Sequence, residues 1–392
     1  MSASVTLSAD SSSDARASGR ANMVTALSLT AFRNYELAEI ECGRASVVLT
    51  GHNGAGKTNI LEALSLLAPG RGMRKAKLRD MTHSGSKGLG WVISANLFGN
   101  QGEVQLGTGI DTDANGESRL VKCNGERLKS HTQLAQHLSI IWQTPQMDGL
   151  FLGSGTDRRA FLDRLVYNFD ASHVTRINQY DYAMRERNKL LSTGSRDAKW
   201  LGVLEQRMAE QALAIADARN NLIERLNHAI MQSATSFPKA QLAMLGEVES
   251  ALREGQPAAD IEASLMQQWE QLRPLDAAAG RTTKGIHRSE FSVRHIRKNM
   301  EAAQCSTGEQ KAMLLAILLA HARARQQWKG TAPILLLDEV VAHLDRIRRQ
   351  ELFDEISAIG AQSWLTGTDA ADFSGIMPDA VAFHVENAQI IA

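Results

Sequence analysis

The chain has 392 residues, of which 43% are hydrophobic and 22% are charged, a composition typical of folded globular proteins with two or three structural units. Its 43 lysines and arginines balance 43 aspartates and glutamates, which excludes a generally polycationic, histone-like binder, so any nucleic-acid site must be a local patch. Three cysteines without CxxC spacing argue against a disulfide framework or a zinc site and indicate a reducing cytoplasm.

The first elements predicted along the chain are a tail and several strands. Residues 1–22 are rich in Ser and Ala and lack the apolar core of a secretory signal, so we expect a disordered tail. No later stretch reaches the roughly 18 consecutive apolar residues of a membrane span. Alternating or β-branched residues predict strands at 26–31, 35–40 and 46–50. Residues 91–125 form short alternating segments with Asn-Gly turns, which predicts antiparallel strands.

The middle of the chain, from 153 to about 236, is predicted to be helical. No Gly or Pro stands between Gly202 and Pro238, so a helix of up to about 35 residues can form there. Its apolar residues recur at steps of three, four or seven, at Leu204, Met208, Ala212, Ile215, Leu222, Leu226 and Ile230. Residues 255–280 contain prolines and an Ala run and are predicted to be a connection, and 334–337 predict a second fully apolar strand.

Residues 51–58 (GHNGAGKT) match the phosphate-binding pattern G-x-x-x-x-G-K-[ST] between a predicted strand and a predicted helix. Backbone N–H groups of such a loop surround phosphate oxygens, and the following helix points its positive end at the same charge. Lys57 would reach the β- and γ-phosphates of ATP, and the Thr58 hydroxyl would bind Mg²⁺. The predicted ATP-binding residues are Gly51, His52, Asn53, Gly54, Ala55, Gly56, Lys57 and Thr58.

The apolar strand at 334–337 ends in two acids, Asp338 and Glu339. Asp338 is predicted to bind Mg²⁺, and Glu339 to lie beside the γ-phosphate, where it would polarise the attacking water. Glu339 and Lys57 are therefore the predicted catalytic residues. The alternative is that an acid after this strand only caps the next helix.

Residues 305–311 (CSTGEQK) precede an apolar helix predicted at 312–322. Ser306 and Gly308 would present a hydroxyl and backbone N–H groups at the start of that helix, a geometry that binds anions. Alternatively, Ser306 is an N-cap and Glu309 its capping-box partner. Both interpretations can hold together.

These three elements, in this order and spacing, resemble the head of ABC ATPases, and 343–345 resemble the D-loop of that superfamily. The resemblance implies an α/β fold, a P-loop ATPase head with a mixed sheet and an antiparallel edge, plus an inserted α-helical subdomain. It also implies an ATP-dependent homodimer, in which Ser306 and Gly308 of one protomer cap the ATP of the other. Remaining candidates are Gln143 or Gln146 for the Q-loop, and Thr366 or Thr368 in place of the usual switch histidine.

The insertion and further motifs resemble the RecF family of bacterial recombination mediators over most of residues 25–392. The motifs are residues 32–35 (FRNY), 70–74 (GRGMR), 157–163 (DRRAFLD), Arg187-Asn188, 280–282 (GRT) and 285–288 (GIHR). By resemblance, the protein would bind double-stranded DNA and gap junctions, with weak, DNA-stimulated ATP hydrolysis that times release. It would help RecO and RecR load RecA, maintain replication forks and support the SOS response. In this family an acid commonly follows the His-Arg pair directly, but here Ser289 precedes Glu290.

This resemblance divides the chain into four parts. We expect the tail at 1–22, the first half of the ATPase lobe at 23–150, the helical inserted subdomain at 151–280 and the second half of the ATPase lobe at 281–392. The alternative function is the ATP-binding subunit of an ABC transporter, against which the large insertion argues. A nucleotide-gated interaction protein that does not hydrolyse ATP and an ATPase-gated nuclease are less favoured, because both acids are retained and no second carboxylate cluster is evident.

Two clusters of cations are candidates for contact with DNA phosphates. The first cluster has five cations in nine residues, and its predicted DNA-binding members are Arg71, Arg74, Lys75 and Lys77. The second comprises Arg281, Lys284, Arg288, Arg294, Arg297 and Lys298. The alternative for the second cluster is a solvated face or ion pairs with the helical insertion. Neither pattern is typical of base reading, so we expect recognition of the DNA backbone.

Overall fold

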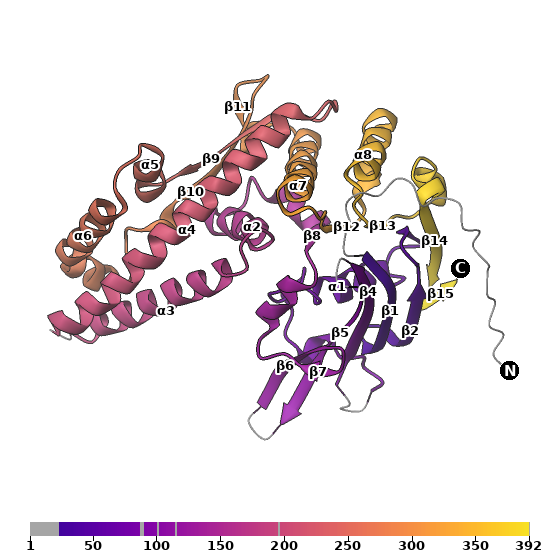
Figure 1. Cartoon of the computed structure of the whole chain (residues 1–392), viewed down its shortest axis with the longest axis horizontal. Helices are drawn as coiled ribbons and strands as arrows, with labels where there is room; N and C mark the ends of the chain where they lie inside the picture. The colour runs from indigo at the N-terminus through magenta and orange to yellow at the C-terminus, as the bar shows by residue number, and fades with distance from the viewer. Residues whose placement is uncertain (1–22, 87–89, 100–101, 114–115, 195–196, 392) are drawn as a thin grey trace.

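The computed structural model describes residues 23–391 apart from 87–89, 100–101, 114–115 and 195–196. The tail predicted at 1–22 lies outside the described residues. Two lobes are evident in Figure 1, one built on two six-stranded sheets and one built mainly of helices. In the part of the chain that the structure describes, no helix is long and apolar enough to cross a membrane.

The first sheet is antiparallel throughout and has the strand order β2-β1-β4-β5-β6-β7. The Asn124-Gly125 turn joins its last two strands, and both residues have positive φ (49° and 84°), as a tight hairpin turn requires. This confirms the antiparallel prediction for 91–125. The strands are β1 (Met23–Phe32), β2 (Tyr35–Glu41), β4 (Val92–Gly99), β5 (Gly102–Asp113), β6 (Gly116–Cys123) and β7 (Glu126–Arg127).

The second sheet has the order β15-β14-β3-β13-β12-β8 and is parallel except for its edge strand β15. Strands β3, β13 and β12 and the edge strand β8 are buried along their whole length, as apolar runs in a parallel sheet covered on both faces should be. The predicted mixed sheet with an antiparallel edge is confirmed. The strands are β3 (Ser46–Thr50), β8 (Ile140–Gln143), β12 (Ile334–Leu337), β13 (Ser363–Thr366), β14 (Ala380–Glu386) and β15 (Gln389–Ile391).

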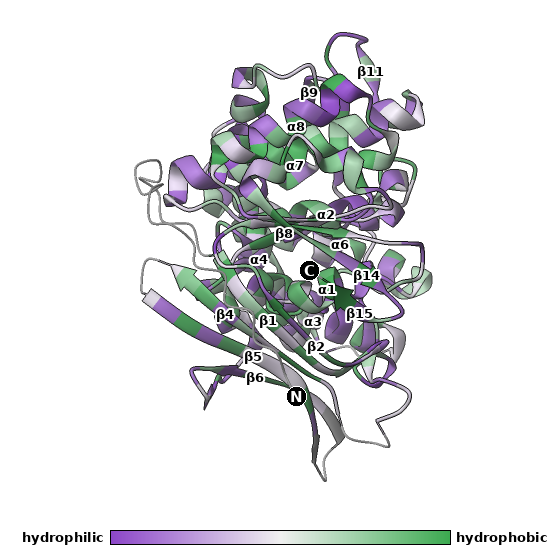
Figure 2. Cartoon of the chain, turned by 90° about the vertical axis from the view of Figure 1, so that its right-hand side faces the viewer, coloured by the Kyte–Doolittle hydropathy of each residue, from purple (hydrophilic) through white to green (hydrophobic). Residues whose placement is uncertain are grey.

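Hydrophobic cores lie on both faces of the second sheet. Alternate residues of β12 enter them: Ile334 and Leu336 pack in the core shared with the first sheet, whereas Leu335 and Leu337 pack on the other side. The first core also holds α1 (Lys57–Ser65), and the second holds α7 (Thr307–Lys329) and α8 (Arg346–Ile359). Figure 2 shows the hydrophobic residues of α7 beside the sheet.

The helical lobe is inserted in the sequence between β8 and β12 of the second sheet, and it extends away from both sheets in Figure 1. Its long helix α4 has 35 residues and buries the predicted apolar stripe, which confirms the prediction. A small antiparallel sheet is formed by β9, β10 and β11. Strand β9 precedes residue 280, the predicted end of the inserted subdomain, whereas β10 and β11 follow it. The elements are α2 (Gly155–Tyr167), α3 (His173–Ser192), α4 (Ala198–Gln232), β9 (Ala240–Leu245), α5 (Glu247–Arg253), α6 (Ala258–Ala279), β10 (Glu290–His295) and β11 (Met300–Glu301).

The prediction that 255–280 form a connection was wrong, because helix α6 occupies 258–279. Its apolar stripe, formed by Ile261, Leu265 and Trp269, is buried at steps of four residues. Pro274 stands inside the helix and removes a single backbone donor. Burial of a tryptophan and two aliphatic side chains contributes about 1.5–3 kcal/mol each, which offsets that local cost of about 3 kcal/mol.

A buried arginine connects three helices of this lobe. Arg187 of α3 has a fully buried side chain and donates to Glu205 of α4 at 2.9 Å and to Asp276 of α6 at 2.7 Å. It also donates to the Thr282 hydroxyl at 3.1 Å and the Trp269 carbonyl at 2.8 Å. These bonds satisfy a charge that would otherwise be costly to bury.

Substitution Arg187→Met is expected to lower the free energy of unfolding by about 3–5 kcal/mol, because it leaves the buried Asp276 carboxylate without its cation and removes one of the two cations bound to Glu205. Urea denaturation measures this change as a lower midpoint. The control is Arg207→Met, which replaces an exposed arginine of α4 and should change stability by about 0.5 kcal/mol or less. Equal midpoints for the two variants would contradict a stabilising role for the Arg187 network.

Candidate functional site

The predicted phosphate loop lies between β3 and α1. Gly51, Gly54 and Gly56 all have positive φ, at 140°, 85° and 123°. A Cβ at Gly51 would lie 2.1 Å from the Val385 carbonyl oxygen, and one at Gly56 would lie 2.5 Å from the Tyr35 hydroxyl. Only glycine fits these two positions, for reasons of both conformation and space.

The turn between β1 and β2 braces this loop. Asn34 donates to the Ala55 carbonyl at 3.2 Å and accepts from the Asn59 side chain at 2.7 Å. Arg33 forms a two-pronged ion pair with Glu62 of α1, at 2.6 and 2.8 Å. The FRNY motif therefore holds the loop and the first turns of its helix in place, a structural role that its sequence pattern alone did not indicate.

The Lys57 ammonium lies within the loop and is 4% exposed. It donates to the carbonyl oxygens of Gly51 at 2.6 Å and His52 at 2.9 Å. Burial lowers the pKa of Lys57, whereas the charges of Glu339 and Asp338 act in the opposite direction. The loop thus places a cation among glycines and beside two acids, as binding of a Mg²⁺-nucleotide requires.

Asp338 and Thr58 meet at the carboxyl end of the second sheet. The Thr58 hydroxyl donates to Asp338 Oδ1 at 3.0 Å, and the Thr366 hydroxyl donates to the same oxygen at 2.8 Å. Burial raises the pKa of Asp338 and the Glu339 charge raises it further, although the two hydroxyls lower it. This set of hydroxyl and carboxylate oxygens suits Mg²⁺, which prefers hard oxygen ligands.

Glu339 follows in a left-handed conformation with φ of 50°, a strained geometry for a residue other than glycine. Its backbone N–H donates to the Thr366 hydroxyl at 2.8 Å. Thr366 is fully buried at the end of β13, so a single hydroxyl orients both acids. Between the two threonines considered from sequence, it is Thr366 that contacts the acidic pair.

Substitution Thr366→Val preserves the shape of the side chain but leaves the Glu339 N–H without its acceptor and removes one of the two hydroxyls that donate to Asp338 Oδ1. We expect ATP hydrolysis to fall by about 10–100-fold, with a smaller effect on ATP affinity, because roughly 1–3 kcal/mol of positioning is lost. Phosphate release and equilibrium ATP binding measure the two effects. Thr366→Ser retains the hydroxyl and should restore most of the rate, whereas an equally slow serine variant would argue against this role.

The structure places the two candidate Q-loop glutamines differently. Gln143 is buried at the end of β8, where its carbonyl accepts from the Asp338 N–H at 3.1 Å. Gln146 is exposed on the short helix η3 (Pro145–Gly149). Gln143 also donates to Asp148 at 3.3 Å. Of the two candidates, Gln143 is therefore the glutamine that lies beside Asp338, at the carboxyl end of the second sheet.

Two contributors at this edge were missed from sequence, Asp148 and Lys311. The Lys311 ammonium lies 3.5 Å from an Asp148 oxygen and 3.5 Å from the Glu339 carbonyl. Lys311 is buried at 4% exposure, so η3 and the first turn of α7 are connected beside Glu339. The sequence did contain an indication that Lys311 has a specific role, since it is a cation at the start of an otherwise apolar helical run.

Ser306 and Gly308 lie at the exposed N-terminus of α7. The Ser306 backbone N–H and hydroxyl both donate to Glu309, at 3.2 and 3.0 Å, as the capping-box interpretation predicts. The Lys298 ammonium at 2.5 Å, together with Ser306, lowers the pKa of Glu309 to about 2. Apart from its own helical turn, no heavy atom of the described residues lies within 4 Å of a Cβ built on Gly308, so this helix start is open to a ligand or another protomer.

The cations predicted to contact DNA differ in their surroundings. Arg74 donates to Asn59 at 2.7 Å and to Glu62 at 3.0 Å, so it is anchored to α1. Arg71 and Lys75 line a cleft, and Lys77 is exposed. Three cations of the second cluster form ion pairs. Lys284 pairs with Glu247 of the predicted helical insertion, as the alternative interpretation expected, whereas Arg294 pairs with Glu301 and Lys298 with Glu309, both outside that insertion.

Comparison with known proteins gives consistent matches. The RecF/RecN/SMC N terminal domain family matches residues 23–371. A DNA replication and repair protein RecF of Agrobacterium fabrum is 48% identical over 93% of this chain and 97% of its own, and one of Rhizobium rhizogenes is 44% identical over 94% and 98%. A solved structure of the recombination mediator protein RecF-ATPrS in the RecFOR pathway has a TM-score of 0.82 at 22% identity and covers 95% of this chain and 98% of that one. The Smc head domain of Pyrococcus furiosus has a TM-score of 0.52 at 16% identity over 94% and 95%.

Proposed function

This chain belongs to the RecF family of DNA replication and repair proteins, and from that premise we propose that it is an ATP-dependent DNA-binding protein of recombinational repair and replication-fork maintenance. The observation that carries the proposal is the convergence of Lys57, Thr58, Asp338 and Thr366 at one sheet edge. The transporter-subunit alternative is not supported, because the RecF relatives match over nearly the whole chain.

The phosphate loop and the two acids at the end of β12 would bind different parts of Mg²⁺-ATP. Lys57 and the loop N–H groups would bind the phosphates, and Thr58 and Asp338 would hold Mg²⁺, which neutralises phosphate charge when bound. Glu339 would accept the proton of the attacking water, positioned by its N–H bond to Thr366. Strain at Glu339 supports this role, because sparsely populated backbone conformations cluster at active sites.

The second half of the site would come from another copy of the chain. The open helix start at Ser306 and Gly308 presents a hydroxyl and the positive end of α7, which suits a γ-phosphate held by a partner's Lys57 loop. Hydrolysis by a lone protomer would then be weak. Slow hydrolysis in the dimer would time its release from DNA.

We expect double-stranded DNA and gap junctions as ligands and RecO and RecR as protein partners, in the loading of RecA and support of the SOS response in the cytoplasm. The RecF relatives and the named RecFOR pathway of a structural neighbour support this expectation. Among the predicted contacts, Arg71, Lys75 and Lys77 are the stronger candidates, since Arg74 already binds Glu62.

Sedimentation of the Glu339→Gln protein, with and without ATP and a gapped duplex, tests the proposal. A monomer-to-dimer shift that needs ATP and raises DNA affinity is the expected result. A protein that binds ATP, remains monomeric and ignores DNA would instead favour an interaction protein in which ATP is structural.

A further inference from the structure

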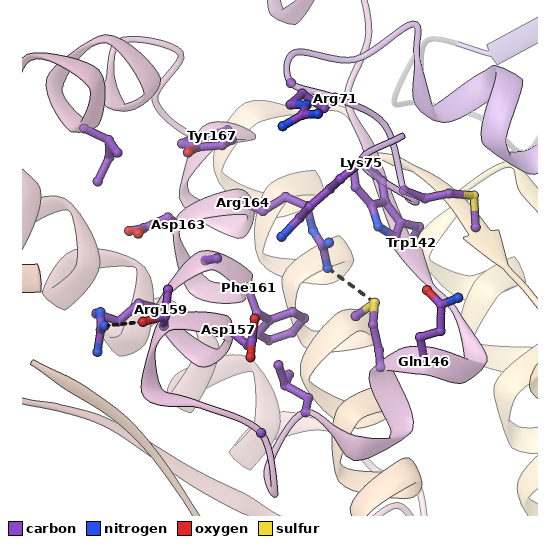
Figure 3. Close-up of a pocket in the computed structure, with 18 of the residues that line it drawn as sticks. Arg71, Lys75, Trp142, Gln146, Asp157, Arg159, Phe161, Asp163, Arg164 and Tyr167 are labelled. Carbon is purple, nitrogen blue, oxygen red and sulfur yellow. Dashed lines mark hydrogen bonds between the residues drawn. The ribbon is translucent and has the colours of Figure 1, made fainter. Parts of the chain in front are cut away.

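A cleft of about 920 Å³ lies between the two lobes, next to the ATP edge. Its walls are the loop at 70–75, η3, helix α2 and the turn η4 (Ile286–Arg288) (Figure 3). The volume is within the roughly 300–1,000 Å³ of small-ligand pockets. We call this space the inter-lobe cleft.

Arg164 is a cation of the inter-lobe cleft without an acidic partner among the described residues. Its guanidinium lies over the Trp142 ring at 4.4 Å and near the Phe161 ring at 5.4 Å. The guanidinium donates to the Met147 sulfur at 3.6 Å, and its buried Nε has no hydrogen-bond partner within the described part of the chain. Burial lowers the pKa of Arg164 to about 10, so it still carries a charge at neutral pH.

Further cations face the same space. Arg71 and Lys75 extend from their loop toward α2, across from Tyr167 (Figure 3). Lys75 has a φ of 54°, a strained conformation that is retained at the mouth of the cleft. Arg288 lines the opposite wall, and Arg159 donates to two neutral oxygens, the Ser289 carbonyl and the Thr156 hydroxyl.

The carboxylates that line the cleft are largely engaged elsewhere. Asp163 binds Arg219 at 2.8 and 2.9 Å and His173 at 2.9 Å. Asp157 accepts from the Ser154 N–H and hydroxyl at the start of α2, although it also lies near enough to Lys75 to feel its charge. Asp181 is the third acid that lines the cleft, against the cations Arg71, Arg74, Lys75, Arg159, Arg164, Arg219 and Arg288. The cleft therefore has an excess of positive charge.

Flat side chains accompany this charge. Tyr167 is partly exposed on the α2 wall, and the Arg164 guanidinium lies over Trp142. Cations that bind phosphates, combined with aromatic or guanidinium planes on which bases stack, are the features of single-stranded nucleic-acid sites. Duplex DNA is too wide for a cleft of this volume, whereas one or two unstacked nucleotides fit.

We propose that the inter-lobe cleft binds an unpaired nucleotide of a DNA strand, with phosphate held by Arg71, Lys75 and Arg164 and the base against Tyr167. The proposal rests on the proposed DNA-binding function and specifies how a gap would be distinguished from continuous duplex. Backbone contacts elsewhere would then bind duplex of any kind, and the cleft would add affinity only where an unpaired strand is present.

Fluorescence anisotropy with three DNAs tests this assignment: a labelled oligo(dT) strand, a gapped duplex and a blunt duplex, each with ATP and in the Glu339→Gln background. Arg164→Met, which keeps the packing on Trp142 but removes the charge, should weaken binding of the single strand and the gapped duplex about tenfold. Blunt-duplex affinity should change less than about twofold. The control Lys329→Gln removes an exposed cation at the far end of α7 and should leave all three affinities unchanged.

Photocrosslinking gives a second measurement that does not depend on a variant. Oligo(dT) carrying 5-iododeoxyuridine should crosslink to Tyr167 or to another aromatic of the cleft, and excess unlabelled oligo(dT) should suppress the crosslink. Crosslinks that map outside the cleft, together with an unaltered Arg164→Met protein, would overturn the proposal while leaving DNA binding intact. Protection by free dTMP but not by the oligonucleotide would assign the cleft to a mononucleotide instead. Failure of the parent Glu339→Gln protein to bind any of the three DNAs would overturn the proposed function itself.

Discussion

Substitution Glu339→Gln is expected to lower ATP hydrolysis by about 10²–10⁴-fold while leaving ATP binding close to that of the wild-type protein. The amide has nearly the shape of the carboxylate but cannot accept the water proton. The groups that hold the nucleotide, Lys57, Thr58 and Asp338, are unchanged. Steady-state phosphate release and equilibrium binding of labelled ATP measure the two quantities separately.

Two further observations make this test specific. Glu339→Gln should accumulate as an ATP-bound dimer, because hydrolysis is the step that would separate the protomers. The control Glu270→Gln replaces an exposed acid of α6 in the helical lobe and should hydrolyse ATP at the wild-type rate. Undiminished hydrolysis by Glu339→Gln would mean that another group activates the water.

Substitution Ser306→Arg should leave ATP binding intact but weaken ATP-dependent dimerisation by about 10–100-fold or more. In the sandwich arrangement this helix start faces the partner's nucleotide, and a long side chain there overpacks the interface at a cost of about 1–3 kcal/mol. Analytical ultracentrifugation with ATP, in the Glu339→Gln background, measures the effect. Normal dimerisation of Ser306→Arg would show that the sandwich arrangement is wrong for this chain.

The capping role of Ser306 requires a separate control. Ser306→Ala removes the hydroxyl that donates to Glu309 and should cost about 1 kcal/mol of stability, but it adds no bulk to the interface. If Ser306→Ala loses dimerisation as completely as Ser306→Arg, the loss reflects a frayed α7 and not a blocked contact. Thermal unfolding of both variants separates these two explanations.

Local patterns in the sequence were sufficient for the main elements of the ATPase lobe and for the long helix. The phosphate loop could be predicted from residues 51–58 alone, because its shape depends on the conformations of its own glycines and on the strand and helix that adjoin it. The 35-residue α4 followed from an uninterrupted apolar period. The buried strands β3 and β12 followed from apolar runs, because only strands covered on both faces tolerate them.

Contacts between distant segments were decided only by the tertiary structure. Asp338, Thr58 and Thr366 meet because β12, β13 and β3 are neighbours in a parallel sheet, an order that no local pattern contains. Helix α6 formed despite Pro274 because Trp269 is buried among other helices.

The same limit applies to the cations. Arg71, Arg74 and Lys75 are alike in sequence and all three line the inter-lobe cleft, yet Arg74 is also bound to Glu62 of α1. Arg164 lies in no cationic cluster of the sequence and became a candidate only through the aromatic rings that surround it. Sequence therefore determined which chemical groups and local conformations are available, whereas packing determined which charges are paired and which remain free to bind a ligand, because pairing depends on distances between segments remote in the chain.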